Sequence, residues 1–271
     1  PTASGKTLIY NAAALHALSR DPAAKALYLF PTKALSQDQL AELFDLNKLM
    51  GDRLGLFTYD GDTPASMRKA IRRQAQIVIT NPDMLHAGIL PHHTKWAKLF
   101  ENLRHVVIDE IHYYTGVFGS HLTNVLRRLQ RVCAFYGSRP TFIMSSATIA
   151  NPAELAGKLI ERPVTLVDRS GAPRGEKFLV FFNPPVVNRQ LGIRRSYVSM
   201  AREVAGVLLE NDLQVITFAN SRLITEILVK YLKNDFERTV AQQGTIRGYR
   251  GGYLPKLRRE IEQGLRAGKI R

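Results

Sequence analysis

Two short clusters of residues have the types and spacing that binding and cleaving a nucleoside triphosphate would require. The first is Gly5-Lys6-Thr7, which ends the segment 1–7. In a glycine-rich loop at a helix start, backbone N–H groups bind phosphate oxygens, the lysine reaches the β- and γ-phosphates, and the hydroxyl ligates Mg²⁺. The expected nucleotide-binding residues are Thr2, Ala3, Ser4, Gly5, Lys6 and Thr7. Because so short a triplet also arises by chance, it needs a partner cluster.

That partner is Asp109-Glu110, which follows the apolar run 106–108. Two carboxylates at the end of a strand can divide the work of hydrolysis. Asp109 would hold Mg²⁺ together with Thr7, and Glu110 would polarise the attacking water. A solvent-exposed acidic turn explains Asp-Glu taken alone, but it explains the pair poorly when a phosphate-binding loop lies upstream. We therefore expect Lys6, Asp109 and Glu110 to be the catalytic residues.

A third cluster, Ser145-Ser146-Ala147-Thr148, follows another apolar run. A Ser-Ala-Thr triplet alone is equally well explained by a helix cap ahead of Pro152. If both apolar runs are strands of one parallel sheet, the hydroxyls of this cluster lie at the same sheet edge as Glu110. This position favours Ser146 and Thr148 as a relay between the nucleotide and a nucleic-acid face.

A sheet must position these residues, and the first 168 residues have the pattern of one. Short apolar runs alternate with amphipathic segments, which predicts a doubly wound, mostly parallel sheet with ligands beyond the carboxyl ends of its strands. The predicted strands are 26–30, 54–58, 77–80, 105–108 and 141–145, and the clearest helices are 6–18, 35–49 and 120–136. Because a phosphate-binding loop normally follows a buried strand, we also expect a strand before Pro1.

A Gly-, Pro- and Arg-rich stretch at 168–176 is typical of a linker, and it divides the chain into domains 1–168 and 169–271. The second domain repeats the α/β pattern. Its predicted strands are 177–182 and 214–218, and its predicted helices are 197–209, 222–232 and 254–265. So few strands do not complete a doubly wound sheet, so we expect this domain to be truncated.

The chain is strongly basic, with a formal net charge of +15. Residues 1–168 hold 19 Lys and Arg against 14 Asp and Glu, whereas residues 169–271 hold 19 against 9. Such an excess favours a polyanionic partner, although composition alone fits a basic soluble protein equally well. The single cysteine, Cys133, excludes an internal disulfide and a cysteine zinc cluster within these residues, and no apolar run approaches the length of a membrane span.

In this order, Gly-Lys-Thr, Asp-Glu-Ile-His and Ser-Ala-Thr resemble the first three motifs of superfamily two helicases. The resemblance implies tandem RecA-like P-loop NTPase domains, each with a parallel sheet between helices, that use ATP and Mg²⁺. It implies that His112 links the γ-phosphate site to the second domain, and that Lys33, Thr80 and Arg222 donate to phosphate oxygens. The full set of expected nucleic-acid contacts is Pro31, Thr32, Lys33, Gly61, Asp62, Thr80, Asn81, Asn220, Ser221, Arg222 and Arg250.

A narrower resemblance covers nearly the whole chain. The segments 109–121, 183–185, 249–255 and 258–262 are similar to those of the MrfA/YprA-type DExH DNA-repair helicases. This similarity implies a cytoplasmic motor, nucleoid-associated if the source is bacterial, that moves 3′ to 5′ on single-stranded or partly duplex DNA. The motif contacts reach the backbone, so an RNA-acting helicase stays an alternative.

Two further alternatives differ in class. One is another P-loop enzyme such as a nucleotide kinase, which predicts neither the Ser-Ala-Thr cluster nor a second basic domain. The other is a catalytically impaired scaffold that binds DNA, against which the intact Lys6, Asp109 and Glu110 argue. The fifth and sixth helicase motifs, the latter with its arginine finger, do not occur within residues 1–271. We therefore expect this stretch alone to hydrolyse ATP poorly.

Overall fold

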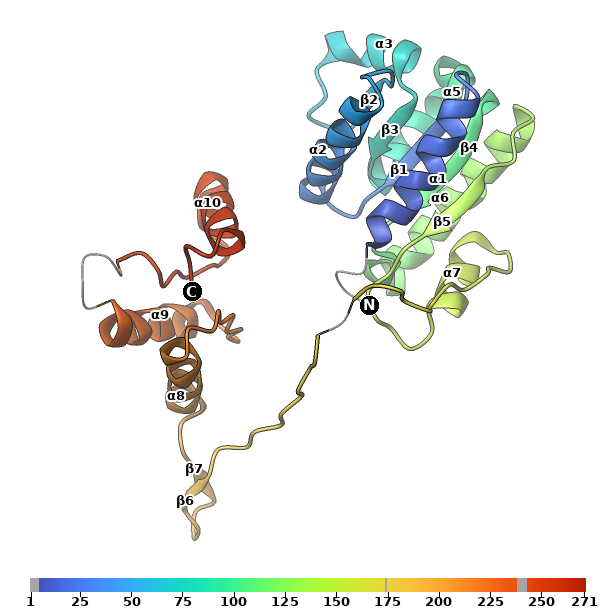
Figure 1. Ribbon diagram of the computed structural model, residues 1–271. Helices are drawn as coiled ribbons and strands as arrows, with labels where there is room; N and C mark the ends of the chain where they lie inside the picture. The colour runs from blue at the N-terminus through green and yellow to red at the C-terminus, as the bar shows by residue number, and fades with distance from the viewer. Residues whose placement is uncertain (1–4, 174, 238–242) are drawn as a thin grey trace. The chain divides into compact units, whose positions relative to one another are not determined.

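A computed structural model describes residues 5–173, 175–237 and 243–271 (Figure 1). The chain forms two compact units, Pro1–Gly175 and Glu176–Arg271. The first unit contains the sheet on which the predicted chemistry depends. Among the described residues, no helix is long and apolar enough to cross a membrane.

The first unit is built on five parallel strands in the order β2-β3-β1-β4-β5. Their bounds are Lys25–Leu29 for β1, Leu56–Thr58 for β2, Ile77–Thr80 for β3, Leu103–Ile108 for β4 and Thr141–Met144 for β5. All five predicted strands are confirmed, with small shifts at their ends. Because every strand runs the same way, the loops that follow the strands all leave from one edge of the sheet.

Side chains alternate between the two faces of this sheet, and both faces are buried. Tyr28 and Phe30 face the helices α1 (Lys6–Arg20) and α2 (Lys33–Leu49). Leu27 and Leu29 lie in the opposite core. The helices that contribute to that core are α3 (Ala65–Gln74), α5 (Ala97–Glu101), α6 (Gly116–Phe135) and α7 (Pro152–Ile160). The sheet therefore lies between two helical layers (Figure 1).

Short helical turns occupy the connections. These are α4 (Pro82–Met84), a π-helical turn at Leu85–Ile89, a 3₁₀ turn at Leu90–Trp96 and another at Ile111–Tyr113. The predicted helix 120–136 is confirmed within α6, and its apolar stripe includes Cys133. Burial raises the pKa of this thiol to about 11, so Cys133 is a neutral core residue at physiological pH.

The second unit has helices at each of its three predicted positions. These are α8 (Tyr197–Glu210), α9 (Arg222–Phe236) and α10 (Pro255–Arg266). Ala205, Leu209, Leu232 and Ile246 form its small core. A two-stranded antiparallel hairpin, β6 (Val186–Asn188) with β7 (Ile193–Arg194), was not among the predicted elements.

The strands predicted at 177–182 and 214–218 are not paired strands among the described residues, so these two predictions are wrong for this structure. A strand persists only where a neighbouring chain satisfies its backbone groups. Here Val215 N donates to Arg271 O at 2.9 Å, and Arg271 N donates to Thr245 O at 2.9 Å. These single bonds do not extend into a ladder. The segment 178–182 has large apolar side chains that are exposed.

Candidate nucleotide site and nucleic-acid edge

The amino end of α1 has the backbone of a phosphate-binding turn. Gly5 precedes the helix with φ 72° and ψ 23°, a left-handed conformation that favours glycine. A Cβ atom at Gly5 would meet no atom within 4 Å, so this side of the turn is open. Lys6 and Thr7 form the start of α1 and are partly buried. Thr2, Ala3 and Ser4, also predicted here, lie outside the described residues.

The Asp109 carboxylate, at the end of β4, is buried and accepts three hydrogen bonds. The Tyr10 hydroxyl lies 3.1 Å from Oδ2, the backbone N–H of Glu110 donates to Oδ1 at 2.9 Å, and the Ser145 hydroxyl also donates to Oδ1. Burial, and then the negative charge of Asp109, raises the pKa of Tyr10 far above its usual value. Tyr10 therefore stays protonated and acts as a donor. It joins the phosphate-binding helix to the end of β4.

Glu110 has a left-handed backbone, with φ 54° and ψ 47°. This conformation costs a non-glycine residue roughly 1–2 kcal/mol, and it turns Glu110 away from the strand direction of Asp109. The Glu110 side chain is 32% exposed. Its Oε2 atom is buried and has no hydrogen-bond partner among the described residues, so only part of the side chain is exposed, whereas Asp109 is enclosed.

His112 lies between Glu110 and the Ser-Ala-Thr loop. Its Nδ1 atom accepts the backbone N–H of Ala147 at 3.2 Å and lies 3.0 Å from Glu110 Oε2. Nδ1 accepts from Ala147 only without a proton and pairs with Glu110 Oε2 only with one, so the two contacts exclude each other. The geometry connects the loops that follow β4 and β5.

Within the third cluster, Ser145 rather than Ser146 contacts Asp109. The β4–β5 register explains this, because Ile108 pairs with Met144 and the next residues of the two strands are side by side. The buried Ser146 hydroxyl has no hydrogen-bond partner among the described residues, and Thr148 is exposed. Sequence reasoning missed Ser145 and Tyr10. Strand register would have indicated Ser145, whereas no local signal indicates Tyr10.

The loops after β1, β2 and β3 lie at the same sheet edge and contain the other candidates of the first unit. Thr32 caps α2 by accepting from Leu35 N at 3.3 Å, and Asn81 caps α4 by accepting from Met84 N at 2.8 Å. Pro31 is partly buried, next to the Thr32 cap. These residues fix the loop geometry, and they leave Lys33 exposed at the start of α2.

Two contacts join these loops to one another. Lys33 Nζ lies 2.5 Å from Asp62 Oδ2, and a Cβ on Gly61 would come within 4.0 Å of Lys33 Nζ. The Thr80 hydroxyl is buried and donates to Tyr59 O at 2.5 Å. Thr80 thus anchors the loop after β2, and its hydroxyl is already used within the protein.

In the second unit, Ser221 caps α9 by accepting from Ile224 N at 3.2 Å, and Asn220 and Arg222 beside it are exposed. Among the described residues, the Arg250 side chain, unlike that of the exposed Arg222, has two side-chain contacts within the unit. Its Nε donates to Glu226 Oε1 at 2.6 Å, and its guanidinium lies 4.8 Å from the centre of the Tyr253 ring.

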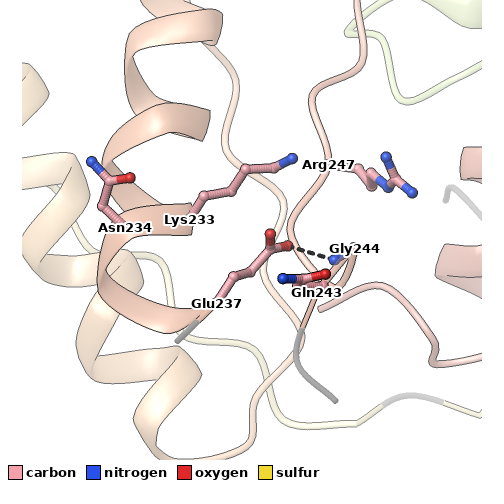
Figure 2. Close-up of a pocket in the computed structure, with 6 residues that line it drawn as sticks. All are labelled: Lys233, Asn234, Glu237, Gln243, Gly244 and Arg247. Carbon is pink, nitrogen blue, oxygen red and sulfur yellow. Dashed lines mark hydrogen bonds between the residues drawn. The ribbon is translucent and has the colours of Figure 1, made fainter. Parts of the chain in front are cut away.

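Figure 2 shows an open, polar pocket of about 700 Å³ in the second unit that no predicted site residue lines. Its lining residues are Lys233, Asn234, Glu237, Gln243, Gly244 and Arg247. Glu237 Oε1 accepts from Gly244 N at 3.0 Å and from Ile246 N at 2.8 Å. This carboxylate therefore holds the backbone at Gly244 and Ile246 against the end of α9.

Residues 1–155, more than half of the chain, match the DEAD/DEAH box helicase family. The chain belongs to this family. It is 56% identical over 270 residues to the uncharacterised ATP-dependent helicase YprA of Bacillus subtilis, covering 100% of this chain and 36% of YprA. It is 38% identical over 282 residues to the ATP-dependent helicase HRQ1 of Saccharomyces cerevisiae, covering 100% of this chain and 26% of HRQ1.

Among solved structures, the chain is similar to the DUF1998 helicase MrfA in a crystal structure with DNA and AMPPNP. The TM-score is 0.94 at 56% identity, over 100% of this chain and 37% of MrfA. The α/β fold with a five-stranded parallel sheet is thus shared with helicases of this family. The chain spans about a third of the length of such relatives.

Proposed function

We propose that this chain is the motor region of a helicase or translocase that couples ATP hydrolysis to movement along single-stranded DNA, with a role in DNA repair. The observation that carries the proposal is the pair Asp109-Glu110 at the end of β4, one carboxylate enclosed and the other on a partly exposed side chain whose buried Oε2 atom has no hydrogen-bond partner among the described residues. Tyr10 ties that pair to the helix that starts at Gly5. The arrangement suits phosphoryl transfer to water.

The nucleotide end of the site follows from this arrangement. Lys6, Thr7 and the open turn at Gly5 would hold the phosphates, together with Thr2, Ala3 and Ser4. A Mg²⁺ ion would be held by Thr7 and Asp109, whose buried carboxylate at a strand end has the oxygen chemistry that this ion prefers. The ion would neutralise charge on the phosphates. Glu110 would take the proton of the attacking water.

Coupling to nucleic acid would run along the same sheet edge. His112 contacts Ala147, which joins the Asp-Glu-Ile-His and Ser-Ala-Thr loops. Ser146 has a buried hydroxyl without a partner among the described residues, which a change in either loop would engage. Lys33, Arg222 and the capped loops around them would bind backbone phosphates without reading sequence. Thr80 supports this surface from within, by fixing the loop that contains Gly61 and Asp62.

The net charge of +15 supports a nucleic-acid partner. The preference for DNA is supported by the similarity to MrfA, whose crystal structure contains DNA. A protein of this kind acts where DNA is present, in the cytoplasm or, in a bacterium, at the nucleoid. The division of the chain into RecA-like domains 1–168 and 169–271 belongs to the same proposal.

The experiment is steady-state ATP hydrolysis by the complete protein without nucleic acid, with single-stranded DNA and with RNA of the same sequence. Lys6→Ala and Glu110→Gln should each lower turnover at least about 100-fold, because each removes a group that acts on the transferring phosphate. Glu110→Gln should still bind ATP. Lys48→Ala and Glu154→Gln are matched controls at exposed sites and should leave turnover unchanged.

Each alternative has its own result. If RNA stimulates ATP hydrolysis as strongly as DNA or more strongly, the proposed preference for DNA is wrong and RNA is the substrate. DNA binding without turnover by the wild type would identify a scaffold. Turnover without any nucleic-acid response would indicate another class of P-loop enzyme, and wild-type turnover by Lys6→Ala or Glu110→Gln would remove those residues from the mechanism.

A further inference from the structure

The Tyr10 hydroxyl lies against acceptor oxygens from two different parts of the site, and the Thr7 side chain also hydrogen-bonds to it. Tyr10 is 1% exposed on α1. Its oxygen lies 3.1 Å from Asp109 Oδ2 and 3.1 Å from Gln39 Oε1. Gln39 belongs to α2, the helix whose first residue is Lys33. One oxygen atom therefore connects the proposed metal-binding carboxylate with the helix that begins at the proposed nucleic-acid edge.

Both contacts cannot be hydrogen bonds from Tyr10 at the same time. A phenol has one proton to donate, and both partners present an acceptor oxygen. Gln39 is oriented by its own amide group, since Nε2 donates to Glu42 Oε2 at 3.3 Å. When the proton is on the Gln39 side, Asp109 Oδ2 loses a donor and is available to another ligand. When the proton is on the Asp109 side, the tie to α2 is lost.

We propose that Tyr10 is a positioning residue that couples the nucleotide site to nucleic-acid binding through this choice of acceptor. The inference rests on the function proposed above. A shift of α2, which carries Lys33 at its amino end, would move Gln39 relative to Tyr10 and bias the hydroxyl toward one acceptor. The orientation of the Asp109 carboxylate would follow. By reciprocity, a ligand at Asp109 would bias α2 in return.

Tyr28 shows what a purely structural tyrosine looks like in the same core. It is fully buried, packs edge-on against Tyr10 with ring centroids 5.7 Å apart, and donates to Asn11 Oδ1 at 3.0 Å. Neither Tyr28 nor Asn11 contacts Asp109 or α2 through a hydrogen bond in the described structure. Removing the Tyr28 hydroxyl thus changes core polarity as much as removing that of Tyr10, without breaking the connection.

The experiment measures coupling directly in the complete protein. The dissociation constant for a fluorescent single-stranded DNA is determined with and without saturating AMPPNP and Mg²⁺, and the ratio is the coupling factor. DNA-stimulated hydrolysis is measured beside it. The variants are Tyr10→Phe and Gln39→Met. Their matched controls are Tyr28→Phe in the core and Gln37→Met on the exposed side of α2.

Typical allosteric factors are about 5–150-fold. Tyr10→Phe and Gln39→Met should each bring the factor close to one, and the double variant should lose no more than either alone. The two controls should stay within about twofold of the wild type, and thermal unfolding should show that Tyr10→Phe is no less folded than Tyr28→Phe. Loss of thermal stability with an unchanged factor would assign Tyr10 a structural role and overturn the inference.

The remaining outcomes separate this inference from the proposed function. A wild type with neither a coupling factor nor DNA-stimulated hydrolysis would overturn the proposed function, and the inference with it. A coupled wild type whose Tyr10→Phe variant is equally coupled would overturn the inference alone. If Tyr10→Phe uncouples but Gln39→Met does not, the route through α2 is wrong.

Discussion

At the scale of single residues, hydrogen bonds already in place decide which side chains are available to a ligand. Thr80 ends β3 and Lys33 begins α2, both at the carboxyl edge of the sheet, and both are expected to contact phosphate. Lys33 is exposed and pairs with the exposed Asp62 carboxylate, an exchangeable partner. Thr80 is buried and bonded to the Tyr59 carbonyl. We therefore expect the two residues to differ in role, although both were predicted to contact phosphate.

Thr80→Val tests this difference. It removes the hydroxyl and leaves the Tyr59 carbonyl without a partner, so the free energy of unfolding should fall by about 1–3 kcal/mol. Single-stranded DNA affinity at fixed salt should stay within about twofold. Thr123→Val in α6 is the control for stability. The Thr123 hydroxyl donates to Gly119 O, a carbonyl of the same helix that the helical backbone also bonds, so its loss leaves no carbonyl without a partner. A large drop in DNA affinity at unchanged stability would show that the Thr80 hydroxyl binds nucleic acid.

At the scale of elements, much of this architecture could be read from the sequence. Apolar runs that alternate with amphipathic segments predicted the five strands of the first sheet, because β1, β3 and β4 are largely buried and even β2 and β5 are mostly covered. The Asp109-Glu110 pair was predicted at a strand end and lies there. The segments 177–182 and 214–218 have the same composition, but pairing depends on neighbours that composition does not contain. The connection from Tyr10 to Asp109 crosses elements far apart in sequence, so no local pattern could reveal it.

Several predicted nucleic-acid contacts are also helix caps, so they have a structural role besides the proposed binding role. Ser221 at the start of α9 allows the two roles to be separated. Ser221→Ala should cost about 1 kcal/mol of stability by removing the cap of α9. Ser221→Asp keeps the cap but adds a negative charge, so stability should hold while single-stranded DNA affinity falls several-fold at low salt. Ser221→Asn is the neutral, capped control. Unchanged DNA affinity in Ser221→Asp would exclude this loop from the nucleic-acid surface.

At the scale of the whole molecule, the chain consists of two compact units whose charges differ. The part beyond residue 168 carries the larger excess of Lys and Arg although it is the shorter. Between the last helix of the first unit and residue 173, the backbone has no helix or strand and is mostly exposed. The predicted linker at 168–176 overlaps this stretch.

Limited trypsin digestion of the complete protein should locate this connection. Early cleavage within this part of the chain is expected after Arg169, which is exposed and lies outside helices and strands. The arginines of α6, Arg127, Arg128 and Arg131, should resist because a helix must unfold locally before a protease can bind it. Mass spectrometry of the first fragments identifies the cut. Initial cleavage inside α6 would contradict the division into units described here.

The contacts between neighbouring loops decide which segments can be exchanged between related proteins. Lys33 and Asp62 join the loops after β1 and β2, and Thr80 ties the end of β3 to Tyr59. A loop grafted singly from a relative would leave one member of each pair without its counterpart. These three loops therefore form one module that is best exchanged as a set. A chimaera that carries all three loops should fold and keep the affinity for single-stranded DNA that we propose. A chimaera with only one exchanged loop should lose that affinity.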